Sequence, residues 1–172
     1  MSQVWYTVLV GLVGVERLAE LVVAKRNLAW SLARGGRETG FGHYPFMVVL
    51  HTGLLVGCLA EVWLGDRDFR SWLGWPMLAL VLAAQALRWW CIRTLGHQWN
   101  TRIVVVPGLS KVTGGPYRMF AHPNYVAVVV EGFALPLVHG AWLTALLFSV
   151  LNAFLLTVRV RAENDALRTA HA

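Results

Sequence analysis

Five long apolar stretches dominate the chain, and short polar segments separate them. They cover residues 4–24, 44–64, 72–92, 124–137 and 140–160. About 20 apolar residues are needed to cross the hydrocarbon core of a bilayer as a helix, so the pattern predicts five membrane-spanning helices, of which the fourth is short. Pro136 and Gly140 flank the residues between the last two stretches, which predicts a tight turn and a C-terminal helical hairpin.

The composition supports an all-α integral membrane protein. Hydrophobic residues make up 57% of the 172-residue chain and charged residues only 14%, against roughly 25% charged residues in an ordinary soluble domain. Five spans leave about 70 residues for everything else, which excludes a separate soluble enzyme domain. Residues 1–24 lack a basic n-region and a small-residue cleavage site, so we expect a retained first span. The two cysteines exclude a disulfide framework and a thiolate metal cluster.

The distribution of the fifteen Lys and Arg residues predicts the orientation in the membrane. Arg67 and Arg70 lie between the second and third stretches, where Asp66 and Asp68 offset them. Twelve others lie at or after the ends of the first, third and fifth stretches: Lys25, Arg26, Arg34, Arg37, Arg88, Arg93, Arg102, Lys111, Arg118, Arg159, Arg161 and Arg168. Basic residues gather on the cytoplasmic side, so we expect the N-terminus outside and the C-terminus in the cytoplasm. The net charge of +6 then reflects topology and not a nucleic-acid partner.

The longest interval between spans, residues 95–121, is the predicted site of a water-soluble ligand. It contains a strand-like run at Ile103–Val106, a turn at Pro107 and Gly108, and a return through Lys111–Thr113, which predicts a short β-hairpin. Six tryptophans near the ends of the second and third stretches are expected to anchor the chain at the headgroup boundary: Trp63, Trp72, Trp75, Trp89, Trp90 and Trp99.

Ionisable residues inside the predicted spans are functional candidates, because burying charge in a membrane is costly. They are Glu16, Arg17, Glu20, His51, Glu61 and Glu131. Glu16 and Glu20 lie one helical turn apart with Arg17 beside them, which is as typical of a buried structural ion cluster as of a functional site. Each of the other three could form an interhelical hydrogen bond or contact a ligand.

Two motifs in the C-terminal half carry the strongest chemical signal. The first runs from Gly115 to Tyr125 and places two prolines around a Tyr-Arg pair, followed by a His and a Tyr at the start of the fourth stretch. The second contains Arg159 and Glu163, which share one helix face where the fifth stretch ends. Alone, the second motif is typical of a surface salt bridge. Together, the two motifs favour a ligand site.

These motifs resemble the isoprenylcysteine carboxyl methyltransferase family of integral membrane enzymes. The family signature is Val-Thr-x-Gly-x-Tyr, then Arg-His-Pro-x-Tyr, then Arg-x-x-x-Glu-Glu, and the matching stretches are 112–117, 121–125 and 159–164. The resemblance covers about residues 95–167. In this chain Ala121 replaces the arginine before His-Pro, and Asn164 replaces the second glutamate.

The resemblance implies methyl transfer from S-adenosylmethionine, with Arg159 addressing the acceptor and with Arg159, His122 and Glu163 as the catalytic residues. The residues carried over to the cofactor site are Leu109, Ser110, Lys111, Val112, Tyr117, His122, Pro123, Asn124, Tyr125 and Glu163. Their chemistry agrees in outline, since the cofactor presents a carboxylate, an ammonium, a sulfonium and an adenine. Backbone groups around Lys111, one carboxylate and two tyrosine rings supply the partners. No metal is expected.

The N-terminal half resembles a bacterial branch of the family that methylates hydroxyls of alkylpyrones and alkylresorcinols. The stretches that carry this resemblance are 17–21, 25–27, 38–40 and 43–44. It implies a lipophilic acceptor and contact with membrane lipid in a bacterial inner membrane. It also implies four candidate residues of the acceptor pocket, which are Glu20, Asn27, His43 and His51. The alternative is that these four residues cap helices or pair within the bundle. We therefore expect residues 1–94 to form the acceptor and lipid-contact region and residues 95–172 the catalytic region.

Three other functions are compatible with the sequence. The first is carboxyl methylation of an isoprenylcysteine-like substrate, which the family resemblance equally implies. The second is a non-catalytic lipid-binding membrane protein that keeps the fold. The third is a small transporter with a pathway through the intramembrane carboxylates Glu16, Glu20, Glu61 and Glu131, although the chain shows no inverted repeat. The oligomeric state is not indicated by the sequence.

Overall fold

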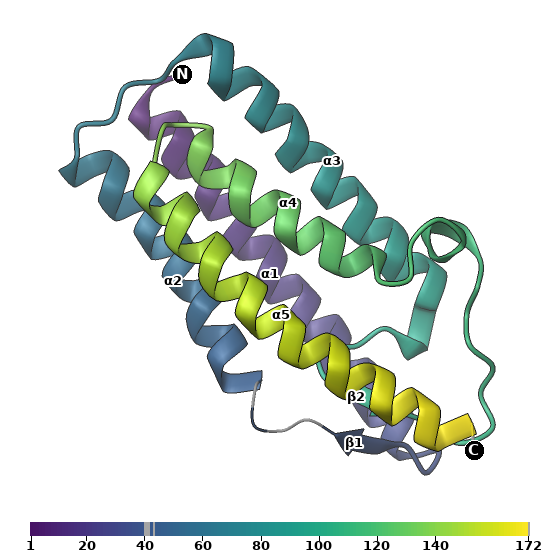
Figure 1. The fold of residues 1–172 in the computed structure, drawn as a ribbon. Coiled ribbons are helices and arrows are strands. Elements are labelled where there is room, and N and C mark those ends of the chain that lie inside the picture. The colour runs from purple at the N-terminus through teal and green to yellow at the C-terminus, as the bar shows by residue number, and fades with distance from the viewer. Residues whose placement is uncertain (40–41, 43, 172) are drawn as a thin grey trace.

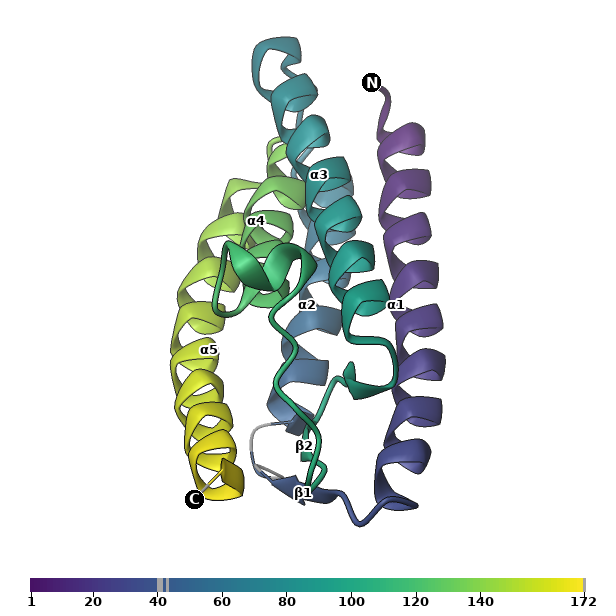
Figure 2. The same ribbon diagram turned by 90° about the vertical axis from the view of Figure 1, so that its right-hand side faces the viewer.

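The computed structural model describes residues 1–39, 42 and 44–171 and contains five long helices, as predicted. They are α1 (Gln3–Leu32), α2 (Tyr44–Leu64), α3 (Ser71–Leu95), α4 (Pro123–Leu137) and α5 (Trp142–His171). The helices run alongside one another as a bundle, and the two termini lie at opposite ends of it (Figure 1). Helix α4 packs between α3 and α5, and α2 packs against α1 and α5. The second view shows α1 beside α3 (Figure 2).

Three of these helices are long and apolar enough to cross a membrane. They are α2, α3 and α5, with mean hydropathies of 1.8, 1.3 and 1.9. Helix α4 is apolar but has only 15 residues, and α1 carries Glu16, Arg17 and Glu20 in its middle. The chain is therefore an all-α membrane protein.

The predicted turn between α4 and α5 is present. Gly140 has a φ of +71°, a conformation that favours glycine. Glu61 of α2 then accepts hydrogen bonds from the backbone N–H groups of Leu143 and Thr144, at 3.1 and 2.7 Å. This carboxylate satisfies donors in the first turn of α5 and so fixes the outer end of the hairpin.

The apolar core is divided into two clusters along α1. The larger cluster fills the half of the bundle nearer the N-terminus, and its buried members are Tyr6, Val10, Val13, Leu54, Cys58, Val62, Val81, Ala134, Leu135, Val138, Ala141 and Phe148. The smaller cluster, Ala24, Ile92 and Trp99, lies near the other end of α1. Between Val13 and Ala24 the buried side of α1 is polar, because Glu20 is buried there at 5% exposure.

The predicted β-hairpin within residues 95–121 is wrong. Strand β2 (Ile103–Val105) pairs antiparallel with β1 (Arg37–Thr39), the segment between α1 and α2. The apolar run identified one strand, but its partner is a short polar segment without the alternation that marks a strand. An ion pair of 2.8 Å between Arg102 and Glu38 supports the pairing. The expected return strand, Lys111–Thr113, has no regular structure.

Two further predictions need correction. Trp99 is not at the headgroup boundary, because it is only 2% exposed and packs against Ala24 and Ile92. Arg88, which the charge count placed among the cytoplasmic cations, is 4% exposed inside the bundle. Both residues lie near the end of an apolar stretch and point into the bundle. The position of a residue along an apolar stretch does not indicate whether its side chain points inward or outward.

Candidate functional site

A cavity of about 470 Å³ lies beside the C-terminal part of α5. This volume is typical of small-molecule sites, which span roughly 300–1,000 Å³. Its walls come from residues 95–125, from β2 within that segment, and from the part of α5 between Arg159 and Leu167. Ser31, near the end of α1, is the one lining residue that precedes Leu95 in the described chain.

The cavity brings together all the residues that the motifs proposed for the cofactor, together with Arg159. These are Leu109, Ser110, Lys111, Val112, Tyr117, His122, Pro123, Asn124, Tyr125 and Glu163. Residues more than 50 positions apart in the chain thus face one space. Ala121 and Asn164, the two positions that depart from the family signature, also line it. The role of these residues in binding stays a prediction.

A chain of polar contacts crosses the cavity wall between α4 and α5. The Nε of Arg159 donates to the hydroxyl of Tyr125 at 2.7 Å, and that hydroxyl donates to Oε2 of Glu163. Arg159 is 5% exposed, and its Nη2 donates to the carbonyl of Thr101 at 2.6 Å. Tyr125 therefore connects the guanidinium and the carboxylate and orders both groups.

His122 lies beside this chain at the start of α4. Its ring stacks on Tyr125 with centroids 5.3 Å apart and an interplanar angle of 23°. Its Nδ1 is 3.7 Å from Oε1 of Glu163, and both side chains are partly exposed, at 23% and 29%. An imidazole and a carboxylate thus lie next to each other where a small molecule can reach them.

Three other residues that line the cavity carry a different chemistry. Lys111 lies in the irregular segment after β2 and is exposed. Arg102 is held by Glu38, and this hydrogen bond raises the pKa of the guanidinium above its ordinary value. Burial, with the Cys91 thiol beside it, raises the pKa of Tyr117, so its hydroxyl stays protonated at neutral pH. These residues therefore add two cations and a phenol to the lining of the cavity.

Several lining residues lie outside the motifs and were not predicted as site residues. Trp99, Arg102 and Ile103 are among them. They enter the cavity because β2 pairs with β1 and because the chain turns back after α3. The apolar run at Ile103–Val106 predicted a strand in this segment. It did not predict which residues of the strand would line the cavity.

The predicted acceptor residues do not line the cavity, as far as the structure describes them. Asn27 donates to the carbonyls of Gly96 and Trp99, at 3.1 and 2.7 Å, and so ties α1 to the chain after α3. Glu20 pairs with Arg17 at 2.6 Å. Nδ1 of His51 lies 2.8 Å from the carbonyl of Met47 on its own helix. His43 lies outside the described residues.

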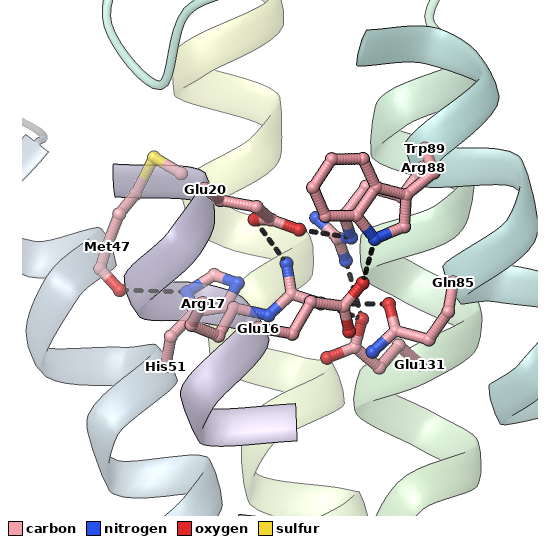
Figure 3. Close-up of polar contacts among 9 residues, drawn as sticks. All are labelled: Glu16, Arg17, Glu20, Met47, His51, Gln85, Arg88, Trp89 and Glu131. Carbon is pink, nitrogen blue, oxygen red and sulfur yellow. Dashed lines mark hydrogen bonds and ion pairs between the residues drawn. The ribbon is translucent and has the colours of Figure 1, made fainter. Parts of the chain in front are cut away.

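Glu20 belongs to a buried group of charges from three helices (Figure 3). Arg17 and Arg88 both contact Glu131 of α4, and Gln85 accepts a hydrogen bond from Arg17. Glu16 accepts a hydrogen bond from the indole N–H of Trp89. The interpretation of these side chains as a structural ion cluster therefore has direct geometric support. Across the described chain, no group of three or more His, Cys, Asp and Glu could hold a metal ion.

Comparison with known proteins places the chain in a family. Residues 77–169, more than half of the chain, match the model of the isoprenylcysteine carboxyl methyltransferase (ICMT) family. The chain is 40% identical over 164 residues to the uncharacterized protein YpbQ of Bacillus subtilis, covering 95% of this chain and 96% of that protein. It is 23% identical over 152 residues, 88% of each chain, to an uncharacterized protein of Haemophilus influenzae. The chain therefore belongs to the isoprenylcysteine carboxyl methyltransferase family of membrane methyltransferases.

Proposed function

We propose that the protein transfers a methyl group from S-adenosylmethionine to a hydroxyl of a long-chain polyketide-type lipid, such as an alkylpyrone or an alkylresorcinol. The observation that carries the proposal is the cavity in which Arg159, Tyr125, Glu163 and His122 meet the segment around Lys111. The family supports methyl transfer in general. The cofactor and the acceptor are the parts proposed here.

The donor set of the cavity fits the cofactor. Glu163 offers a carboxylate to the ammonium, and Lys111 with the neighbouring backbone offers a cation and N–H groups to the carboxylate. The rings of Tyr117 and Tyr125 offer faces to the adenine and to the positive sulfonium. When bound, the cofactor supplies an electrophilic methyl group.

The position of the cavity suits an acceptor that arrives from the bilayer. Helix α4 has 15 residues, so it is about 22 Å long, against about 30 Å for the hydrocarbon core. If the turn after α4 lies at one boundary of the bilayer, the first turn of the helix, with Tyr125, lies within the lipid at the other end. In this proposal a lipid reaches the cavity from the side while the cofactor enters from water, at the cytoplasmic boundary of the inner membrane.

The chain's own residues then have two tasks, alignment and water exclusion. Methyl transfer is an in-line displacement, which depends on positioning. Arg159 is held on one side by Tyr125 and on another by the Thr101 carbonyl, so its guanidinium is ordered to orient the acceptor oxygen. Apolar side chains such as Leu109 and Val112 exclude water from the same space.

A hydroxyl acceptor must lose a proton, and His122 is the proposed base. Its imidazole is partly exposed and lies 3.7 Å from Glu163, whose carboxylate stabilises an imidazolium once the proton has moved. Ala121 and Asn164 support a hydroxyl acceptor. Both line the cavity where the family signature has an arginine and a second glutamate, so the site has lost a cation suited to a carboxylate substrate.

A binding titration tests the cofactor first. Purified protein in detergent or nanodiscs is titrated with S-adenosylmethionine by calorimetry. Saturable binding that is weakened in Glu163→Ala and in His122→Ala supports the methyltransferase. Absence of binding would leave the lipid-binding or transporter function in its place, because neither needs this cofactor. The partnering of Glu20 and Glu131 within the bundle already weighs against a transport pathway.

A competition assay then tests the acceptor. An alkylpyrone, an alkylresorcinol and a prenylcysteine analogue are supplied side by side with labelled S-adenosylmethionine, and the products are identified. Efficient methylation of the prenylcysteine analogue alone would refute the proposed acceptor. For a resorcinol of pKa near about 10 the rate should also rise between about pH 6 and 9, whereas a carboxylate acceptor gives a nearly flat profile.

A further inference from the structure

Glu131 is the one acidic or basic residue among the fifteen residues of α4. Its side chain is 4% exposed, and its Oε2 contacts Arg17 of α1 at 2.5 Å and Arg88 of α3 at 2.6 Å. Figure 3 shows both guanidinium groups converging on this carboxylate. Helix α4 is therefore attached in its middle to two other helices by charge.

The ion network around Glu131 joins carboxylates of α1 and α4 to arginines of α1 and α3. Glu20 pairs with Arg17 at 2.6 Å and lies 3.4 Å from Nε of Arg88. Arg17 and Arg88 thus face Glu20 and Glu131 between the two apolar clusters of the core, and the third carboxylate, Glu16, is held beside them by Trp89. Buried ion pairs of this kind contribute little net stability compared with apolar packing, and their best supported use is to fix the register between elements.

The remainder of α4 is suited to a register constraint. Its other residues are apolar or uncharged after the first turn, so apolar contacts with α3 and α5 alone would permit small shifts along the axis. A second constraint lies next to Glu131, where Gly132 has no room for a Cβ because Phe148 of α5 packs directly on it. The charged and the steric constraint thus act at adjacent residues of the same helix.

The same helix begins in the reaction site. Tyr125 lies six residues before Glu131, which is about 9 Å along a helix. Tyr125 must sit between Arg159 and Glu163 of α5 to contact both. A shift of α4 by about 1 Å would break or stretch these hydrogen bonds, which have little tolerance in length.

We propose that Glu131 is a positioning residue for methyl transfer: through its ion pairs with Arg17 and Arg88 it sets the axial register of α4 and thereby places Tyr125 between Arg159 and Glu163. The inference rests on the proposed function for its effect on turnover. The axial register of α4 is a property of the fold, so it can be measured in the absence of methyl transfer.

The test uses a charge-balanced double variant, Arg88→Met with Glu131→Met. Glu131→Gln alone would leave buried cations without their anion, which threatens folding. The double variant removes one cation and one anion and retains the Arg17–Glu20 pair. We expect a melting temperature within a few degrees of the wild type and a kcat lower by roughly 10- to 100-fold, because misplacement of about 1 Å has effects of that size. Unchanged kcat in the folded double variant would refute the proposal.

Glu61→Gln is the matched control. Glu61 is also a partnered glutamate of the bundle, but it belongs to α2 and contacts the first turn of α5, at the far end of the bundle from the cavity. It should lower the melting temperature while leaving kcat unchanged at temperatures well below the transition. If kcat falls equally in the control and in the double variant, the loss is general and the proposal fails.

A spectroscopic measurement separates this inference from the proposed function. 3-Fluorotyrosine is incorporated at Tyr125, and its ¹⁹F resonance is compared with that of Arg159→Met, in which the contact is removed by design. We expect the resonance of the double variant to move toward that reference. A resonance at the wild-type position would refute the register role even if methyl transfer were demonstrated, and a shifted resonance would support it even if no acceptor were found.

Discussion

Arg159→Lys tests most directly how the polar chain between α4 and α5 works. The substitution keeps the positive charge but replaces three guanidinium nitrogens by one ammonium. In the structure Arg159 uses Nε for the Tyr125 hydroxyl at 2.7 Å and Nη2 for the Thr101 carbonyl at 2.6 Å, and its Nη1 lies against the sulfur of Met47. A single ammonium nitrogen cannot reproduce this planar fork of donors.

The size of the effect follows from the hydrogen bonds that are lost. Each one involves a charged donor at a residue that is 5% exposed, so losing one costs about 1.5–3 kcal/mol. This corresponds to roughly a 10- to 150-fold decrease in kcat/KM if the bond orients the acceptor in the transition state. Cofactor affinity should fall much less than turnover, because Glu163 keeps the hydrogen bond from the Tyr125 hydroxyl and the segment around Lys111 is unaltered.

A double-mutant cycle with Tyr125→Phe provides the assay. Cofactor affinity is measured by calorimetry and turnover by transfer of a labelled methyl group, for the wild type, both single variants and the double variant. If Arg159 acts through the Tyr125 hydroxyl, the double variant should lose little more turnover than the worse single variant. Additive losses to within about 0.5 kcal/mol would show that the two residues act independently and would refute the reasoning.

Three further predictions concern the cofactor, the packing and the topology. Glu163→Ala should weaken S-adenosylmethionine binding by about 1.5–3 kcal/mol, roughly 10- to 150-fold, in a calorimetric titration, and unchanged affinity would remove this carboxylate from the site. Gly132→Ala should lower the melting temperature, because the added Cβ collides with the ring of Phe148, and overpacking of this kind typically costs about 1–3 kcal/mol. A reporter fused at Asp66 should be outside and one at Gly108 cytoplasmic, and a cytoplasmic signal at Asp66 would refute the five-span orientation.

The helices and the core of the site were accessible from the sequence for physical reasons. A bilayer selects long apolar helices, so hydropathy alone located both ends of α2 and α3 and the start of α5 to within about three residues. The end of α5 was missed, because this helix continues to His171 through a polar segment that hydropathy does not register. The residues around His122 and Glu163 belong to ordered motifs, and the fold brings them to one cavity. An ordered set of motifs can predict a shared site, because a ligand site needs several residue types close together.

The pairing of β1 with β2 was not accessible in the same way. Strand propensity is local, whereas the partner is chosen by where α1 and α3 end in space. The segment Arg37–Thr39 is short and polar and becomes a strand because β2 lies beside it, with Glu38 reaching Arg102. The cavity wall contributed by β2 was therefore missed for the same reason as the strand pair.

The structure also refines the charge argument for topology. Arg88 and Arg159 were counted as cytoplasmic cations, yet they are 4% and 5% exposed and hold Glu131 and Tyr125. Removing these two from the twelve leaves ten cations on that side, against the two between α2 and α3 that neighbouring aspartates offset. The predicted orientation is unchanged, because it depends on the basic residues that lie outside the interior of the bundle. The two buried arginines instead mark the places where α4 is held in position, one at its middle and one at its start.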